Sequence, residues 1–141
     1  MISVLPFAVA LLQPYAIDGD TLRDVQGVSY RVENIDAPER GQRAECAHER
    51  ALAETARSYV RAWIERSRTV EALPVGRRDS YGRVVARIEI DGVDLGERLI
   101  ARGLAQPWRG RKANFCAAIP NRSTTPPPRP RWSGARSSRS G

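Results

Sequence analysis

Short runs of alternating apolar and polar residues predict a β-hairpin in the first quarter of the chain. Residues 21–25 and 29–35 each alternate, and Gln26-Gly27 between them is typical of a tight turn. Acidic residues stand on both sides of this pair, with Asp18-Gly19-Asp20 before it and Asp36 after it. The pattern therefore predicts two antiparallel strands with carboxylates at their ends.

A second pair of strands is predicted later in the chain. Residues 83–90 alternate cleanly and end at Asp91-Gly92, another turn signal of the hairpin type. Residues 69–75 can form its partner, although Pro74 lacks an N–H and so favours an edge strand or a bulge. We expect a turn over residues 76–82 between the two.

Two segments change to helical periodicity. Over residues 46–66 the apolar side chains fall on one stripe and charged ones lie largely opposite, so Trp63 is expected in the core and His48 at the surface. A shorter helix is predicted after Asp94, which suits the N-cap position, with Glu97 as its capping-box partner and Gly103 as the stop.

The first residues leave two interpretations open. Residues 2–12 are mostly apolar with a break at Pro6, which suits either the first core strand or the hydrophobic region of a signal peptide. A signal would imply a periplasmic or secreted protein, and a strand a cytoplasmic one. The run is too short to span a membrane, so no membrane span is expected.

Composition and charge limit the size of the protein and the class of its partners. With 141 residues and 41% apolar content the chain can bury one modest core. We expect an apolar N-terminal segment over 1–9, one domain over 10–116 and a Pro/Arg/Ser-rich disordered tail over 117–141. The formal charge of +7 favours polyanions, but residues 117–141 alone carry five arginines and no acid. That tail is either a solvated appendage or an auxiliary anchor for nucleic acid.

Only two cysteines are present, Cys46 and Cys116, which excludes a structural zinc site built from cysteines. In an oxidising compartment they could form one disulfide; otherwise they are two inert thiols. In the chain-entropy model, closing a loop of about 70 residues would contribute about 4 kcal/mol of stability. Both interpretations stay open.

Acidic and basic residues at the predicted strand ends form a candidate phosphodiesterase centre. Asp20 and Asp36 end neighbouring strands and can converge on one hard cation, and Glu39 follows Pro38, which turns the chain. Arg31 and Arg83 can hold a phosphate against them. The dipeptide Asp-Gly alone is only a turn signal, as Asp91-Gly92 shows. In the absence of a ligand the arginines could simply pair with the carboxylates.

Five strands interrupted by a long helix fit a mainly β, α+β fold, a five-stranded Greek-key barrel of the OB type with one long and one short helix. From about Ala10 to Gln106 the chain also resembles the staphylococcal nuclease-like, or thermonuclease, family. The resemblance lies in five motifs in the family's order: Ile17-Asp18-Gly19-Asp20-Thr21, Tyr30-Arg31, Ile35-Asp36-Ala37-Pro38-Glu39, Asp79-Ser80-Tyr81-Gly82-Arg83 and Gly103-Leu104-Ala105.

This resemblance implies a calcium-dependent hydrolase of phosphodiester bonds in DNA or RNA. It implies that Asp20, Asp36 and the backbone carbonyl of Ala37 ligate Ca²⁺, that Arg31 and Arg83 contact the scissile phosphate, and that Glu39 positions or deprotonates the attacking water. Tyr81 would lie against the nucleotide, although an aromatic residue is also common in turns. The expected partner is the nucleic acid, with the protein a monomer and no obligate protein partner.

The chain departs from the family pattern at several points. Ala37 stands where the best-known pattern has threonine, and Ser80 replaces a basic residue, which should weaken anchoring of the substrate. After Pro107 the final long helix of the best-known members is missing. The rival hypothesis is a non-catalytic OB-fold module that only binds nucleic acid.

Overall fold

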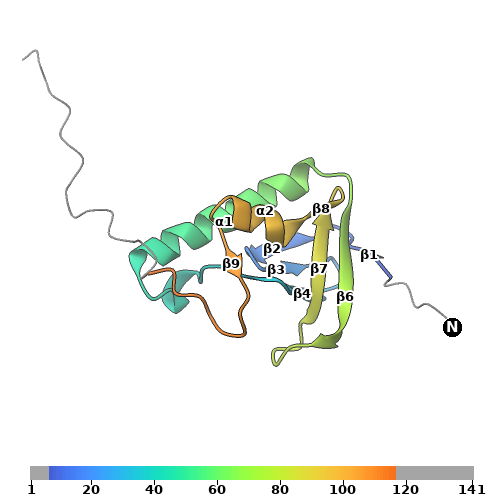
Figure 1. The fold of residues 1–141 in the computed structure, drawn as a ribbon. Helices are drawn as coiled ribbons and strands as arrows, with labels where there is room; N and C mark the ends of the chain where they lie inside the picture. The colour runs from blue at the N-terminus through green and yellow to red at the C-terminus, as the bar shows by residue number, and fades with distance from the viewer. Residues whose placement is uncertain (1–6, 117–141) are drawn as a thin grey trace, which may run out of the picture.

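In the computed structural model, which describes residues 7–116, short β-strands alternate with two α-helices and one 3-10 helix (Figure 1). The predicted tail over 117–141 and residues 1–6 of the apolar segment lie outside the described residues. The elements are β1 (Val9–Ala10), β2 (Tyr15–Asp18), β3 (Thr21–Arg23), β4 (Ser29–Val32), β5 (Ile35–Asp36), η1 (Gly41–Arg43), α1 (Ala47–Arg66), β6 (Val70–Arg78), β7 (Val84–Ile90), β8 (Val93–Asp94), α2 (Leu95–Ala101) and β9 (Gln106–Pro107).

The main sheet has the topology of an OB barrel. Its strand order is β1-β6-β7-β4-β3-β2, with β8 added to β7, and a separate pair is formed by β5 and β9. All neighbours are antiparallel except β4 and β7, which run parallel. Because β1 and β2 are consecutive in the chain but lie at opposite ends of this order, the sheet curls back on itself. The prediction of a mainly β, OB-type fold with one long and one short helix is confirmed.

Strand β6 is longer than its pattern predicted. It extends to Arg78, which pairs with Val84, so the expected turn over 76–82 was wrong at its start and occupies only the residues after Arg78. The register shifts between Pro74 and Arg78, and Gly76 within that interval has a φ of 89°. Pro74 therefore ends regular pairing at a bulge, as expected, and pairing resumes beyond it.

The single strand predicted over residues 29–35 is divided in the structure. β4 ends at Val32, where the main chain turns, and β5 leaves the main sheet to pair with β9. At the turn, the N–H of Glu33 donates to the carbonyl of Ala86 and the carbonyl of Asn34 accepts from the N–H of Trp108. The bend is thus fixed by segments far along the chain.

The long helix α1 packs on β2, across one side of the barrel (Figure 1). Cys46 is its N-cap, and its Sγ accepts a hydrogen bond of 3.4 Å from the N–H of Glu49. Apart from Glu49, the buried side chains of α1 are apolar, and Trp63 is 8% exposed, which confirms its place in the core. His48 is exposed, as expected.

The short helix α2 begins as its sequence predicts. The Asp94 carboxylate accepts a hydrogen bond of 2.8 Å from the N–H of Glu97, and Gly103 takes a φ of 71° after the helix end. The Glu97 carboxylate lies 3.7 Å from the Arg87 guanidinium instead of completing a capping box. Together α1 and α2 close the barrel over a fully buried core that includes Leu22, Val32, Ile35, Ile88, Ile90, Leu95 and Leu99. Within residues 7–116, neither helix is long and apolar enough to cross a membrane.

Candidate active site

The bend between β4 and β5 brings two carboxylates to one guanidinium. Arg31 on β4 lies with its Nη2 3.7 Å from Oδ1 of Asp36 on β5, and with its Nη1 3.6 Å from Oδ2 of Asp20. Arg31 Nη1 also donates to the carbonyls of Val32 and Ile35 at the bend, which fixes the guanidinium in place. The structure therefore brings Asp20, Arg31 and Asp36 together, as their positions at strand ends suggested.

Both carboxylates are buried and hydrogen-bonded. Asp20 is 8% exposed and accepts from the N–H of Ala37 at 3.0 Å and from the hydroxyl of Thr21 at 3.2 Å. Asp36 is 3% exposed and accepts from the N–H of Ala113 at 2.7 Å. Since each carboxylate accepts from a main-chain N–H, the two side chains are held in one orientation each.

Burial also destabilises the charged forms of Asp20 and Asp36. It raises the pKa of Asp20, an effect that the charge of Arg31 and the N–H of Ala37 offset only in part. Burial likewise raises the pKa of Asp36 despite the N–H of Ala113 and the charge of Arg31. Two carboxylates share a single guanidinium, so an additional cation beside them would be favoured electrostatically.

The donor set of this pair fits a hard cation. Carboxylate oxygens without histidine or thiolate are what Ca²⁺ prefers, and Ca²⁺ accepts six to eight oxygens of mixed origin. Within the part of the chain that the structure describes, no three side chains of His, Cys, Asp or Glu cluster closely enough to hold a metal ion by themselves. A calcium ion here would thus take two carboxylates and complete its shell with backbone and water oxygens. The Ala37 carbonyl remains a predicted ligand.

Arg83 reaches the same site from the β6–β7 turn. Its Nε lies 2.6 Å from Oδ2 of Asp79, and its Nη1 donates to the Thr21 hydroxyl at 3.0 Å, which in turn donates to Asp20. Asp79 also accepts from the N–H groups of Tyr81 and Arg83. The same carboxylate therefore stabilises the turn and orients the Arg83 side chain. The sequence contained the signal for this role, because Asp is favoured at the first position of a turn.

Tyr81 stands at the exposed rim of the turn. Tyr81 is 78% exposed, and the Arg83 Cζ lies 5.3 Å from the centroid of its ring. An exposed aromatic face beside a guanidinium suits stacking on a base. The role of Tyr81 stays a prediction.

Glu39 is held through its main chain by a residue that the sequence analysis missed. Its N–H donates to Oε2 of Glu49 at 2.9 Å, and the N–H of Glu45 donates to the other carboxylate oxygen at 2.8 Å. Glu49 is 3% exposed although it is acidic and lies in the first turn of α1. Its carboxylate thus clamps both ends of the loop that carries Glu39, a role that nothing in the local pattern reveals.

A segment near the end of the described chain also contributes to the site. The Trp108 ring centroid lies 5.6 Å from the Arg31 Cζ, and Lys112 Nζ lies 3.2 Å from Oε1 of Glu39. The structure joins Cys46 and Cys116 in a disulfide, which closes this segment onto the start of α1. Sequence reasoning assigned no site role to Trp108 or Lys112.

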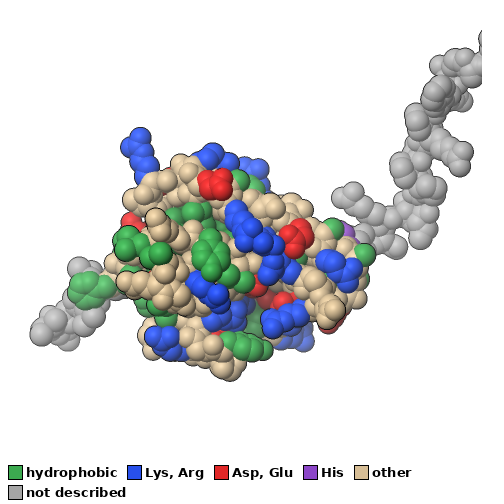
Figure 2. Space-filling model, turned by 180° about the vertical axis from the view of Figure 1, so that it is seen from behind, with side chains coloured by type: hydrophobic (Ala, Val, Ile, Leu, Met, Phe, Trp, Pro, Cys, Tyr) green, Lys and Arg blue, Asp and Glu red, His purple; other side chains and the backbone are tan. Residues whose placement is uncertain are grey.

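The acidic and basic side chains of the candidate site line one open cleft of about 850 Å³, namely those of Asp20, Arg31, Asp36, Glu39, Arg83 and Lys112. The face drawn in Figure 2 presents more Lys and Arg than Asp and Glu side chains. Buried carboxylates within an otherwise basic surface suit an anionic ligand that arrives together with a cation.

A family model described as Staphylococcal nuclease homologue matches residues 29–118, well over half of the chain. The matched range includes Arg31, Asp36, Glu39 and Arg83, and it begins after Asp20. No curated protein sequence matches the chain.

Proposed function

Since the chain belongs to the staphylococcal nuclease homologue family, we propose that it is a calcium-dependent nuclease that hydrolyses phosphodiester bonds of DNA or RNA. The observation that carries the proposal is the placement of Arg31 between two buried carboxylates, with Arg83 linked to one of them through Thr21. This arrangement offers carboxylate oxygens to a cation and guanidinium donors to a phosphate in the same cleft.

Asp20 and Asp36 would hold the calcium ion, with the Ala37 carbonyl as a further ligand. When bound, calcium neutralises the carboxylates and stabilises negative charge on the phosphate oxygens. The protein supplies the orientation, because the main-chain N–H groups of Ala37 and Ala113 fix the two carboxylates.

The two arginines would stabilise the transition state. Attack on a phosphodiester increases the negative charge on its non-bridging oxygens. Guanidinium groups already held in place therefore bind the transition state more strongly than the ground state. Arg31 is held by the carbonyls of Val32 and Ile35, and Arg83 by Asp79. Little reorganisation is then needed during the reaction.

Glu39 would act as the general base. Its carboxylate lines the cleft beside Asp36 and would accept the proton of the attacking water, a contribution of typically ~10²- to 10⁴-fold. Tyr81 would stack on a base of the substrate, which is typically worth about 1–3 kcal/mol of binding.

One observation favours the rival function, a module that binds nucleic acid without cleaving it. Lys112 Nζ lies 3.2 Å from Oε1 of Glu39. If the carboxylate oxygen that must accept the water proton were the one held by Lys112, cleavage would fail while the arginines still bound phosphate. Cleavage in the presence of calcium separates the two functions.

The test is cleavage of labelled single-stranded DNA in calcium and then in chelator. We expect cleavage in calcium only, and a fall by orders of magnitude in Glu39→Gln and in Arg83→Ala, because each removes a group used in the transition state. Glu65→Gln and Arg66→Ala are matched controls, since both residues are exposed on α1 and lie outside the cleft.

Circular dichroism should show the same fold in all five proteins. Equal cleavage by the two site variants and their controls would contradict the assigned roles. Calcium-independent binding of DNA by a wild-type protein that never cleaves it would support the rival function.

A further inference from the structure

Residues 106–116, which we call the arm, leave the barrel and return to it at another place. The arm begins as β9, which pairs with β5, and ends at Cys116, which is bonded to Cys46 at the start of α1. In Figure 1 it is the orange segment that loops out from β9 and comes back beside the first turn of α1. The arm therefore crosses the region in which β5 and the Glu39 loop lie.

Each of three arm residues contacts a different residue of the proposed site. The Trp108 ring lies over the Arg31 guanidinium, the Lys112 ammonium lies 3.2 Å from the Glu39 carboxylate, and the Ala113 N–H donates to Asp36 at 2.7 Å. The arm thus touches a predicted phosphate ligand, the predicted base and a predicted metal ligand. Three such contacts from one short segment indicate that the arm is part of the site.

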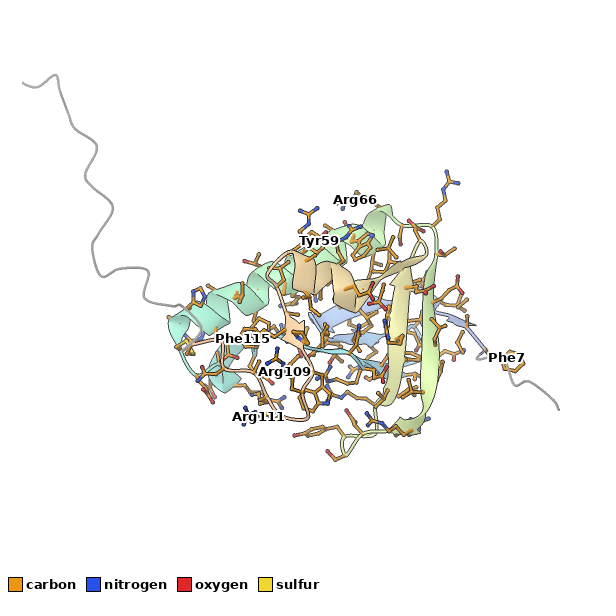
Figure 3. The ribbon with its side chains drawn as sticks, viewed as in Figure 1. Phe7, Tyr59, Arg66, Arg109, Arg111 and Phe115 are labelled. Atoms are coloured by element: carbon orange, nitrogen blue, oxygen red, sulfur yellow. A yellow bond between two sulfur atoms is a disulfide. The ribbon has the colours of Figure 1, made fainter. Side chains whose placement is uncertain are left out.

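The arm has little packing of its own. Residues 107–112 are exposed, and only Phe115, 5% exposed, is buried among residues 107–116. Figure 3 shows Phe115 close to the N-terminal half of α1, with Arg109 and Arg111 farther out along the arm. The buried core of the barrel, within residues 7–116, is built from side chains that precede Gln106. The arm therefore adds little to this core, and its position depends on its two ends.

We propose that the arm positions the active site, with Lys112 as the residue that orients the Glu39 carboxylate and the Cys46–Cys116 disulfide as the bond that holds the arm in place. The inference rests on the proposed nuclease function. It assigns to Lys112, the only lysine in the chain, a role in the reaction, and to the disulfide a role in activity besides stability.

The physical argument is one of preorganisation. A glutamate side chain that rotates freely is only rarely in the orientation needed to accept a proton from the attacking water. A misplacement of about 1 Å can cost ~10²-fold in rate. One ion pair at a partly exposed site adds little to stability. It can still select the rotamer of Glu39, whose main chain Glu49 already fixes.

The first test concerns Lys112. Lys112→Met removes the charge and keeps the length of the side chain, Lys112→Arg keeps the charge, and Arg66→Met is the matched control on α1. We expect kcat to fall about tenfold in Lys112→Met while KM for single-stranded DNA changes less than threefold. Lys112→Arg should recover most of kcat, which a loss through general destabilisation would not do.

The second test concerns the disulfide. Cys46 also caps α1, so the variant used is Cys46→Ser/Cys116→Ser, in which serine keeps an N-cap oxygen and no free thiol remains. At a temperature well below unfolding we expect circular dichroism to be unchanged and kcat to fall about tenfold. A disulfide that serves only stability would leave kcat unchanged under these conditions.

A readout independent of cleavage follows the arm directly. Trp108 is 39% exposed and Trp63 only 8%, so in a Trp132→Phe background the quenching of tryptophan fluorescence by acrylamide reports mainly Trp108. Loss of the disulfide should increase this quenching at least twofold. Unchanged quenching, or equal kcat in Lys112→Met and its control, would overturn the proposal. A wild-type protein that never cleaves DNA would instead overturn the proposed function, and the quenching result would still show whether the disulfide holds the arm.

Discussion

At the scale of single residues, Arg31 shows how its surroundings determine its use. Arginines on strands mostly lie at the surface, but the Arg31 side chain is only 14% exposed and lies between Asp20 and Asp36. Its Nη1 also donates to two carbonyls at the β4–β5 bend. The guanidinium is therefore held where two buried carboxylates need a counter-ion.

Asp94 is the residue for which a stability effect can be predicted most directly. Its carboxylate caps α2, accepts from Asn34 at 3.2 Å and pairs with Arg87 at 2.7 Å. Asp94→Ala removes the cap and the ion pair together, so we expect a loss of about 1–2 kcal/mol in the free energy of unfolding. Urea denaturation measures it. Glu97→Gln, at a side chain that is 74% exposed, should change it by less than about 0.5 kcal/mol.

The effect of Asp94 should also depend on pH. Burial acts to raise the pKa of Asp94, but hydrogen bonds from Glu97, Arg87 and Asn34 and the charge of Arg87 together lower it below its usual value. A carboxyl group whose pKa is lower in the folded state stabilises the fold above its unfolded pKa, about 3.9, and this stabilisation is lost as the pH falls through the folded-state pKa. The difference in Tm between wild type and Asp94→Asn should therefore shrink between pH 7 and pH 3. A constant difference would show that the charge of Asp94 is not involved.

At the scale of elements, the turn between β2 and β3 lies unusually close to α1 and to β5. A Cβ atom at Gly19 would lie 3.1 Å from the Cβ of Ala37 and 3.2 Å from the Cβ of Ala56. Glycine is thus required by space, since its φ is not positive. The close approach places Asp20, the next residue, within reach of the Ala37 N–H.

Gly19→Ala should therefore disturb both stability and the site. The neighbouring methyl groups must move by a few tenths of an ångström, and overpacking of this kind costs typically about 1–3 kcal/mol. We expect a lower midpoint of urea denaturation and a smaller effect of calcium on Tm. Ser58→Ala, at an exposed position of α1, is the control and should leave both unchanged. A wild-type midpoint in Gly19→Ala would mean that the turn can move away from α1 without cost.

At the scale of the whole molecule, the barrel collects site residues that are far apart in the chain. Arg83 meets Thr21 across 62 positions, and Ala113 meets Asp36 across 77. The parallel pairing of β4 with β7 sets Arg31 opposite Val85, two residues beyond Arg83, so that the two arginines lie at neighbouring strands. The cleft is therefore a product of the sheet order.

Calcium should stabilise the whole fold if it binds to the two buried carboxylates. A ligand that binds only the folded state at 100 times its Kd adds about 2.7 kcal/mol to the free energy of unfolding. We expect Tm to rise by several degrees between chelator and saturating calcium, as measured by differential scanning calorimetry. Asp36→Asn should lose this rise, and Glu65→Gln should keep it. No rise in the wild type, or an equal rise in Asp36→Asn, would place calcium elsewhere or exclude it.

The sequence by itself determined most of the local elements and the residue types of the candidate site. The apolar stripe of α1, the Asp94 cap and the turn signals depend on neighbours within a few positions, and the order of short motifs identified the family. Calcium ligation and the catalytic roles remain proposals. The candidate residues for these roles could be identified from the sequence because each motif is short and contiguous.

Only the tertiary structure decided how far β6 extends, where residues 29–35 divide and which groups support the site. Glu49, Lys112 and the Ala113 N–H contact residues from other parts of the fold, so their local sequence gives no sign of a role. A main-chain N–H is present at almost every position, and most glutamate and lysine side chains lie at the surface without a specific role. What makes these groups specific is the folded backbone around them, because hydrogen bonds and ion pairs act over a few ångströms of space and take no account of distance along the chain.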